Sequence, residues 1–210
     1  MTLVDSSAPK LVLASASRSR RRLLEAAGLE IECLAAAVDE TDVKLALKAE
    51  NASAVQVAET LAELKARRVS DRLSGGGGSG PFVIGADQML DCEGQWFDKP
   101  VDLQAARRQL LALSGRSHTL ETSVCVVRDG GRIWHHNASA RLTLRPLSED
   151  FVDRYLSLVG EAALTSVGAY QLEGPGIQLF QQVQGDFFTI LGLPLLPLLT
   201  FLRANGVVPQ

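Results

Sequence analysis

Hydrophobic and polar positions along the chain follow two periods, which predict strands and helices in turn. Short apolar runs such as residues 11–14 are typical of buried strands, and apolar residues between 55 and 64 recur at helical spacing. The predicted strands are Leu11–Ala14, Glu30–Val38, Phe82–Gly85, His118–Arg128, Arg132–Arg145 and Ile177–Val183. The predicted helices after the first are Asn51–Leu73, Leu103–Leu113, Glu149–Val159 and Pro194–Arg203. Because strands alternate with helices and Asp129-Gly-Gly131 predicts a hairpin, the expected fold is α/β, with a mixed central sheet flanked by helices.

The first strand runs directly into two serines and an arginine-rich helix. Ser15 and Ser17 come first, and four arginines follow: Arg18, Arg20, Arg21 and Arg22. An apolar face of the helix is supplied by Leu23, Leu24 and Ala27. Cations at a helix N-terminus oppose the helix dipole, so four arginines there favour an anionic ligand such as a phosphate. The alternative is a solvated basic helix start.

Length and composition allow one sizeable hydrophobic core, either one large lobe or two fused small ones. The chain has 210 residues, of which 46% are hydrophobic. We expect one domain over residues 1–210, with a flexible N-terminal segment at 1–9. With 21 basic and 24 acidic residues the formal net charge is −3, which argues against a general nucleic-acid binder.

The cysteines and the apolar segments bear on where the protein resides. Three cysteines, an odd number without CxxC spacing, predict reduced thiols in the cytoplasm rather than disulfides or a zinc site. The N-terminus lacks the features of a signal peptide. The most apolar segment, 187–202, contains two prolines and is too short to span a bilayer, so no membrane association is expected.

Two acidic positions follow predicted strands, where ligand sites of α/β proteins collect. Asp87 comes just after the apolar run 82–86 and could bind a metal or orient a water, or it could cap a turn. Glu40 and Asp39 could supply a second carboxylate, or could form a solvated turn.

Lysines supply the remaining candidate charges. Lys65 lies on the side of the long helix that carries Leu61 and Leu64, where a lone lysine is usually a solvated stem. Lys99 is more suggestive, because Pro100 restricts it to extended conformations. Arg116 could support either a site or the fold. The glycine run at 75–78 is interpreted as a flexible linker, and the three histidines as structural: His118, His135 and His136.

Together, these segments resemble the Maf proteins, nucleotide pyrophosphatases of the Maf/Ham1-like fold. The resemblance extends over about residues 10 to 206, and the order of its motifs is highly specific although each is weak. The motifs are Leu-Ala-Ser-x-Ser-x-x-Arg at 13–20, Val38-Asp-Glu40, Lys65-Ala66, Gly85-Ala-Asp87, Lys99-Pro100, Ser114-Gly-Arg-x-His118 with Thr122, Gly168-Ala-Tyr170, Glu173-Gly174, Gly185-Asp186 and Gly192-Leu-Pro194.

The resemblance implies two lobes around a cleft and hydrolysis of a nucleoside triphosphate to a monophosphate and pyrophosphate. It implies a divalent cation, Mg²⁺ or Mn²⁺, shared by Glu40 and Asp87, with Asp87 as proton acceptor for the attacking water. The triphosphate would be held by four residues: Ser15, Arg20, Lys65 and Lys99.

Three positions that set nucleobase preference in the family hold Ser19, Gln88 and Glu173 here. Members that act on dTTP and UTP tend to carry Arg, Thr and Gln there, and the 7-methyl-GTP branch tends to carry Trp, Gln and Glu. Two of three positions match the second branch, but Ser19 lacks the stacking surface of a tryptophan. We therefore hypothesise a guanine-type or modified nucleotide, with a dTTP/UTP pyrophosphatase as the alternative.

A different class of function, a non-catalytic nucleotide-binding regulator of cell division, stays open because the family name reflects a link to septum formation. The presence of Asp87, Glu40, Lys65 and Lys99 favours the enzyme, since a pure binder would not need this acid, base and metal set. The resemblance also implies a possible homodimer.

Overall fold

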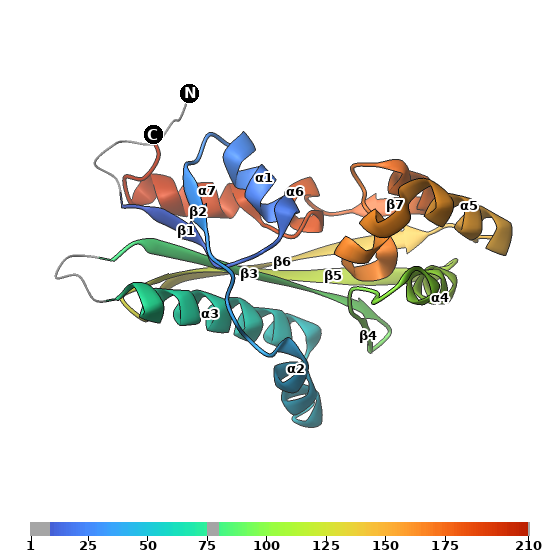
Figure 1. Ribbon diagram of the computed structural model, residues 1–210, viewed down its shortest axis with the longest axis horizontal. Helices are drawn as coiled ribbons and strands as arrows, with labels where there is room; N and C mark the ends of the chain where they lie inside the picture. Colours follow the sequence, from blue (N-terminus) through green and yellow to red (C-terminus); the bar gives the residue numbers. More distant parts are fainter. Residues whose placement is uncertain (1–8, 75–79, 210) are drawn as a thin grey trace. The chain divides into compact units, whose positions relative to one another are not determined.

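The computed structural model describes residues 9–74 and 80–209 of the chain (Figure 1). Residues 1–8 of the predicted N-terminal segment and the glycine run at 75–78 lie outside the described residues. Among the helices of the described part, none is both long and apolar enough to cross a membrane.

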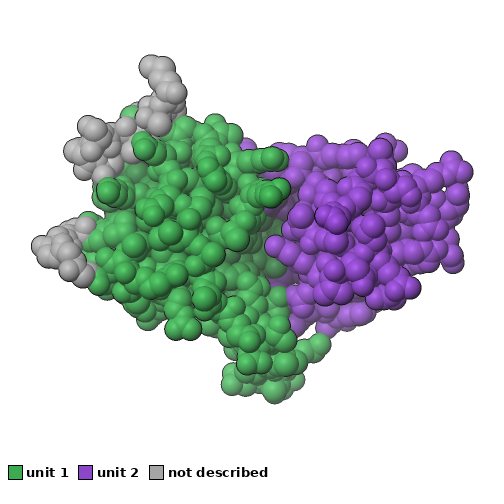
Figure 2. All heavy atoms as spheres, viewed as in Figure 1, with its two compact units in different colours: residues 1–88, 122–138, 192–210 green, residues 89–121, 139–191 purple. Residues whose placement is uncertain are grey.

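The chain divides into two compact units (Figure 2). Unit 1 comprises residues 1–88, 122–138 and 192–210, and unit 2 comprises residues 89–121 and 139–191. Three of the four unit boundaries therefore fall inside long strands, each of which supplies residues to both units, and the fourth follows residue 191.

Strands and helices alternate as the sequence predicts. The strands are β1 (Leu11–Leu13), β2 (Ile31–Cys33), β3 (Phe82–Cys92), β4 (Gln95–Phe97), β5 (Ser117–Arg128), β6 (Gly131–Leu144) and β7 (Phe180–Gln184). The α-helices are α1 (Arg18–Ala26), α2 (Glu40–Ala49), α3 (Ala54–Leu73), α4 (Leu103–Leu113), α5 (Glu149–Val159), α6 (Phe187–Ile190) and α7 (Leu195–Ala204). Three 3-10 helices are η1 (Gly160–Thr165), η2 (Val167–Ala169) and η3 (Pro175–Leu179).

Within the described residues, the strands form a mixed sheet in the order β2-β1-β3-β5-β6-β7, with β4 paired to β3. The pairs β1–β2 and β1–β3 are parallel, whereas β3–β4 and β6–β7 are antiparallel. The predicted α/β fold with a mixed sheet flanked by helices is confirmed.

Helices cover both faces of the sheet in unit 1, with α3 on one face and α7 on the other (Figure 1). Val83 of β3 packs in a cluster with the α3 residues Ala62 and Ala66. The ring of neighbouring Phe82 lies 5.9 Å from that of Phe201 on α7. Successive side chains of a strand point to opposite faces, so this alternation binds one helix to each side.

The closest approach of α3 to the sheet occurs at Gly85 of β3. A Cβ atom at this position would lie 2.1 Å from the carbonyl oxygen of Ala62 and 2.8 Å from the Cβ of Ala66. Only glycine leaves room for the helix backbone here. The glycine therefore sets the distance between the residues of α3 and the following residues of β3.

Unit 2 has its own core, in which apolar residues of its strands pack against α4 and α5. Large, fully buried side chains there include Leu90, Leu110, Leu120 and Leu142. His118 and Tyr170 are also buried in this unit, at 2% and 4% exposure.

Two predicted elements at the carboxylates differ from the structure. The strand predicted at Glu30–Val38 ends at Cys33, and the acidic residues open an unpredicted helix, α2. Its N-cap is Asp39, whose side chain accepts hydrogen bonds from the N–H groups of Thr41 and Asp42. The sequence signal of a helix cap was therefore interpreted as a strand end and turn.

The strand before Asp87 is also longer than predicted, because β3 continues to Cys92. Asp87 therefore lies inside the strand, not after it. A buried carboxylate is tolerated in a strand when a cation pairs with it, and such pairing is invisible in the local sequence. Near the C-terminus, the strand predicted at Ile177–Val183 begins only at Phe180, because Pro175 and Gly176 start a 3-10 turn instead.

Candidate active site

The anion site predicted at the start of α1 is built from a short hydrogen-bonded turn in unit 1. Ser15 Oγ accepts hydrogen bonds from the N–H of Ser17, at 3.1 Å, and from Nη1 of Arg20, at 3.4 Å. Ser17 is the N-cap of α1, and its hydroxyl accepts the N–H of Arg20 at 3.4 Å. This turn directs Arg20 inward, whereas Arg21 is exposed and pairs with Glu25 at 2.7 Å.

Arg20 is fixed by a long-range contact as well. Its Nε donates to the carbonyl oxygen of Gly192 at 2.7 Å, where the glycine has a φ of +94°. Burial lowers the pKa of Arg20, and the negative charges of Asp87 and Glu40 partly oppose this shift. The guanidinium remains a cation at neutral pH and lies within electrostatic reach of both carboxylates.

Lys65 of α3 joins the two predicted carboxylates. Its Nζ lies 2.6 Å from Asp87 Oδ1 and 2.7 Å from Glu40 Oε1. Lys65 is 8% exposed and Asp87 5%, so the pair is buried, while the Glu40 side chain is nearly half exposed. Lys65 is therefore not the solvated stem that a lone helical lysine usually is.

Gly85 explains how these groups meet. Lys65 lies about one turn beyond Ala62 on α3, and Asp87 lies two residues beyond Gly85 on β3. The contact of the helix backbone with Gly85 therefore brings the ammonium and the carboxylate within hydrogen-bond distance. Unit 1 thus holds a cluster of two cations, Lys65 and Arg20, and two carboxylates, Asp87 and Glu40.

Gln88 follows Asp87 in β3, and its side chain is held by a residue for which the sequence suggested no role. The Gln88 Nε2 donates to Oγ1 of Thr122 at 2.8 Å. Thr122, on β5, is completely buried. Thr122 belongs to a family motif, but local sequence cannot show this contact, because it joins residues 34 positions apart across two strands.

The remaining predicted site residues have separate positions. Ser19 lies half-buried in the first turn of α1, in unit 1. Lys99 and Glu173 both belong to unit 2 and are exposed. Lys99 follows β4 and precedes the buried Pro100, and Glu173 lies in the segment between η2 and η3.

Arg116 and the histidines have structural contacts. Arg116 donates to Glu93 Oε2 at 2.6 Å and to the carbonyl oxygen of Ala112, which ties the fold of unit 2 together. His118 Nε2 lies 2.6 Å from the hydroxyl of Tyr170, and burial lowers the pKa of His118 to about 4. This imidazole is therefore neutral at physiological pH.

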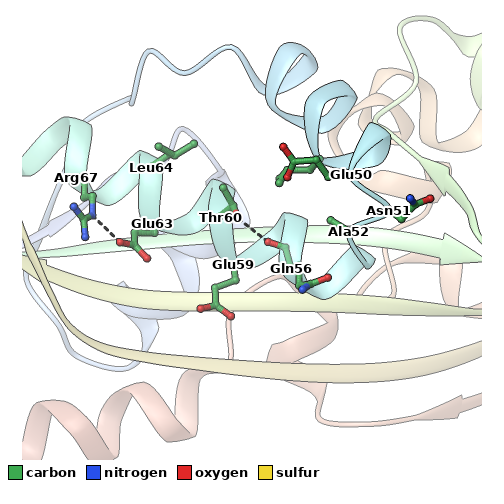
Figure 3. Close-up of a pocket in the computed structure, with 10 residues that line it drawn as sticks. Glu50, Asn51, Ala52, Gln56, Glu59, Thr60, Glu63, Leu64 and Arg67 are labelled. Atoms are coloured by element: carbon green, nitrogen blue, oxygen red, sulfur yellow. Dashed lines mark hydrogen bonds and ion pairs between the residues drawn. The ribbon is translucent and has the colours of Figure 1, made fainter.

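A separate hollow of about 740 Å³ lies where the end of α2 meets the start of α3 (Figure 3). None of the predicted site residues lines it. Its carboxylates Glu59 and Glu63 are bound by Arg132 at 2.7 and 2.8 Å, and Glu63 also pairs with Arg67. The Lys65 cluster, not this hollow, is thus the candidate site.

The metal-ligating capacity of the described residues is limited to pairs of groups. No group of three or more His, Cys, Asp or Glu side chains in this part of the chain could hold a metal ion alone. Glu40 and Asp87 offer hard oxygen donors that share one ammonium and so lie within a few ångström of each other. Mg²⁺ is commonly bound by one or two carboxylates together with waters and substrate phosphates, which this pair fits.

The structure is that of an α/β protein with a parallel β1–β3 pair, and its candidate site joins a capped helix start, an inward arginine and a buried lysine between two carboxylates. The chain belongs to the Maf family, since the family model described as "Maf-like protein" matches residues 10–205. The family predicted from the sequence motifs is confirmed.

Similar proteins carry names that describe one activity. A nucleoside triphosphate pyrophosphatase of Paramagnetospirillum magneticum is 58% identical over 93% of this chain and 98% of its own length. One of Granulibacter bethesdensis is 55% identical over 93% of this chain and 97% of its own length. A 7-methyl-GTP pyrophosphatase of Rhizobium meliloti is 50% identical over 95% of this chain and 98% of its own length. The relatives thus include the branch predicted from Gln88 and Glu173.

Proposed function

We propose that this protein is a nucleoside triphosphate pyrophosphatase that converts a nucleoside triphosphate to a monophosphate and pyrophosphate. The observation that carries the proposal is the buried Lys65 bridge between Asp87 and Glu40. Buried charges are expensive to maintain, and a functional site is a frequent reason for keeping them. The similarity to enzymes of this name over nearly the whole chain supports the same conclusion.

In the proposed reaction, water attacks the α-phosphorus and the bond between the α-phosphorus and the bridging oxygen to the β-phosphate breaks. Asp87 accepts the proton of the water, and Lys65 holds that carboxylate in place through Oδ1. Pyrophosphate leaves with the bridging oxygen. Arg20 and Ser15 at the start of α1, with Lys65, are proposed to bind phosphate oxygens and to stabilise the charge that develops on them.

A divalent cation, Mg²⁺ or Mn²⁺, fits the oxygen donors of this site. Glu40 and Asp87 would hold it, and it would supply neutralisation of phosphate charge. Because the described residues contribute these two carboxylates and no third ligand, we expect the cation to bind mainly with the nucleotide rather than before it.

For the nucleobase, we propose a guanine-type or modified base such as that of 7-methyl-GTP. Gln88 and Glu173 are the proposed base contacts, together with Ser19, while Lys99 is proposed to contact the triphosphate. Relatives named 7-methyl-GTP pyrophosphatase, about 50% identical to this chain, support this preference. A preference for dTTP or UTP would contradict it.

The test is pyrophosphate release with Mg²⁺ or Mn²⁺ from a panel containing 7-methyl-GTP, GTP, dTTP and UTP. Asp87→Asn should lower kcat by about 10²–10⁴-fold, the range for a removed proton acceptor. The matched control is Asp91→Asn, in the same strand, where the carboxylate accepts the N–H of Gly94 in a turn. Nucleotide binding without release by the wild type would instead favour the regulator of cell division.

Two further expectations stay proposals. A homodimer is implied by the resemblance and is tested by sedimentation of the purified chain. A cytoplasmic location is compatible with three cysteines that are all free, two of them buried, and is tested by fractionation of cells.

A further inference from the structure

The segment that carries Glu173 has little regular structure of its own. Residues 166–176 run from η2 to the start of η3, both 3-10 turns of five residues or fewer. Gly168 and Ala169 have φ values of +77° and +61°, and a positive φ is uncommon for alanine. Backbone hydrogen bonds inside the segment close single turns, for example from the N–H of Gly174 to the carbonyl oxygen of Gln171 at 3.3 Å, and side-chain contacts attach these turns to the rest of unit 2.

Tyr170 is the central contact of the segment. Its hydroxyl lies 2.6 Å from Nε2 of His118, and its ring lies edge-on to Phe180 at 4.8 Å between centroids. Its carbonyl oxygen accepts the hydroxyl of Ser166. A Cβ at Gly168 would come within 2.5 Å of the Tyr170 ring, so the chain wraps closely around this side chain.

His118 anchors Tyr170 to the sheet. It lies on β5 and is 2% exposed, and Nδ1 has no hydrogen-bond partner among the described residues. The tyrosine hydroxyl is thus the one polar side-chain group to which the imidazole bonds within the described chain. An apolar pair of similar size would avoid the unpaired nitrogen, so stability alone is a poor reason for a histidine here.

The anchor lies three residues before Glu173, and the positions between are also tied down. Gln171 Nε2 donates to Thr165 Oγ1 at 2.9 Å, and Gly176 packs against the carbonyl oxygen of Gln171, where a Cβ would come within 2.4 Å. Leu172 is buried, whereas Glu173 is exposed. The segment therefore presents one carboxylate outward from a clamped backbone.

We propose that His118 and Tyr170 are positioning residues for nucleobase selection: their hydrogen bond fixes residues 166–176 and thereby the carboxylate of Glu173. This inference rests on the proposed function, in which Glu173 contacts the base. Neither residue touches the reacting phosphates in this role. Losing the hydrogen bond should therefore change which nucleotide is preferred more than it changes kcat on the best substrate.

The experiment compares kcat and KM of the wild type and Tyr170→Phe on 7-methyl-GTP, GTP and dTTP. We expect the ratio of kcat/KM between the best and worst substrate to fall by about three- to tenfold, mainly through KM, with kcat on the best substrate within about twofold. Hydrogen exchange of amides 167–176 should rise above that of the rest of unit 2.

Two variants separate positioning from general stability. Leu156→Val removes one methylene from the core of unit 2 on α5, an element that carries neither His118 nor Tyr170, and should lower Tm while leaving the substrate ratio unchanged. The double variant His118→Leu/Tyr170→Phe removes both polar partners, so Tm should recover, yet the substrate ratio should stay altered. A ratio that follows Tm across these variants, or one unchanged in Tyr170→Phe, overturns the proposal.

Failure of the proposed function gives a different result. Nucleotide affinities are measured in parallel by calorimetry, so base preference is visible without turnover. A wild type that binds but releases no pyrophosphate, with affinities that still change in Tyr170→Phe, refutes the enzyme but keeps His118 and Tyr170 as positioning residues. Affinities and kinetics that are both insensitive to the hydroxyl refute the positioning role.

Discussion

Both units bury polar side chains, but they do so with opposite chemistry. Unit 1 buries an ion pair, Lys65 with Asp87, next to the half-exposed Glu40. Unit 2 buries a neutral pair, His118 with Tyr170, in which burial lowers the pKa of the imidazole and raises that of the phenol. A charged cluster can exchange its partners for a phosphate or a cation, whereas a neutral pair can only hold a shape. The difference teaches that the two units satisfy their buried polar groups in different ways, by charge pairing in unit 1 and by a neutral hydrogen bond in unit 2.

The largest effect should come from breaking the charged pair. Lys65→Met leaves Asp87 buried without its ammonium, so we expect a loss of about 3–5 kcal/mol in the free energy of unfolding and at least about 100-fold in kcat. Urea denaturation and pyrophosphate release measure the two effects. Adding Asp87→Leu should restore most of the stability but none of the activity. Activity that returns with stability would show that the pair is structural, like the pair in unit 2.

The neutral pair of His118 and Tyr170 should make the free energy of unfolding depend on pH. The pKa of His118 is lowered from 6.5 to about 4 in the folded protein, so the unfolded chain binds more protons between these values. The contribution of His118 to the free energy of unfolding should therefore be fully present above pH 6.5. The free energy of unfolding should then fall by about 3 kcal/mol as the pH decreases to 4. Urea midpoints across this range measure the loss, which should be much smaller in His118→Leu. An equal acid loss in His118→Leu would assign it to other groups.

Arg20 tests whether charge alone suffices in unit 1. Arg20→Lys keeps the cation but loses the guanidinium geometry that reaches both Gly192 and Ser15, so kcat/KM should fall by about 10-fold. Steady-state kinetics on the preferred nucleotide measure this. Arg21→Lys, an exposed position in the same helix, is the control. Equal effects of the two substitutions would mean that the arginines act only as a diffuse positive field.

The smallest effect should come from the hydrogen bond between Gln88 and Thr122, a neutral contact inside the charged unit. Thr122→Val removes the hydroxyl at constant shape, and Thr122→Ser keeps it. We expect Thr122→Val to cost about 1 kcal/mol of stability and to change the ratio of kcat/KM between nucleobases a few-fold. If Thr122→Ser shifts the ratio as much as Thr122→Val, packing rather than the hydrogen bond orients Gln88.

Local pattern predicted much of the fold and part of the site. Apolar periodicity predicted the helices at Leu103–Leu113 and Glu149–Val159, which the structure shows capped by Asp102 and Ser148, and the alternation of elements predicted a mixed sheet. Local pattern failed where the deciding contact is distant. Asp87 was expected after a strand because its partner Lys65 lies 22 residues away, and a paired carboxylate can stay within β3.

The same reason explains the residues to which no role was given. Thr122 and Tyr170 each act through one hydrogen bond to a residue 34 and 52 positions away. The family motifs included both residues, but their spacing carries no information about which atoms meet. His118 was interpreted as structural from the sequence, and its bond to the segment of Glu173 became visible only in the three-dimensional arrangement.

The ion pair between Lys65 and Asp87 depends on Gly85, a residue that has no side chain. Lys65 and Asp87 meet because the backbone of α3 rests on this residue, with no space for even a methyl group. Any search for altered activity that varies positions 65 and 87 therefore explores side chains at one fixed helix-to-strand spacing. The residue at position 85 sets that spacing, so a library that keeps glycine there tests only one distance between α3 and β3.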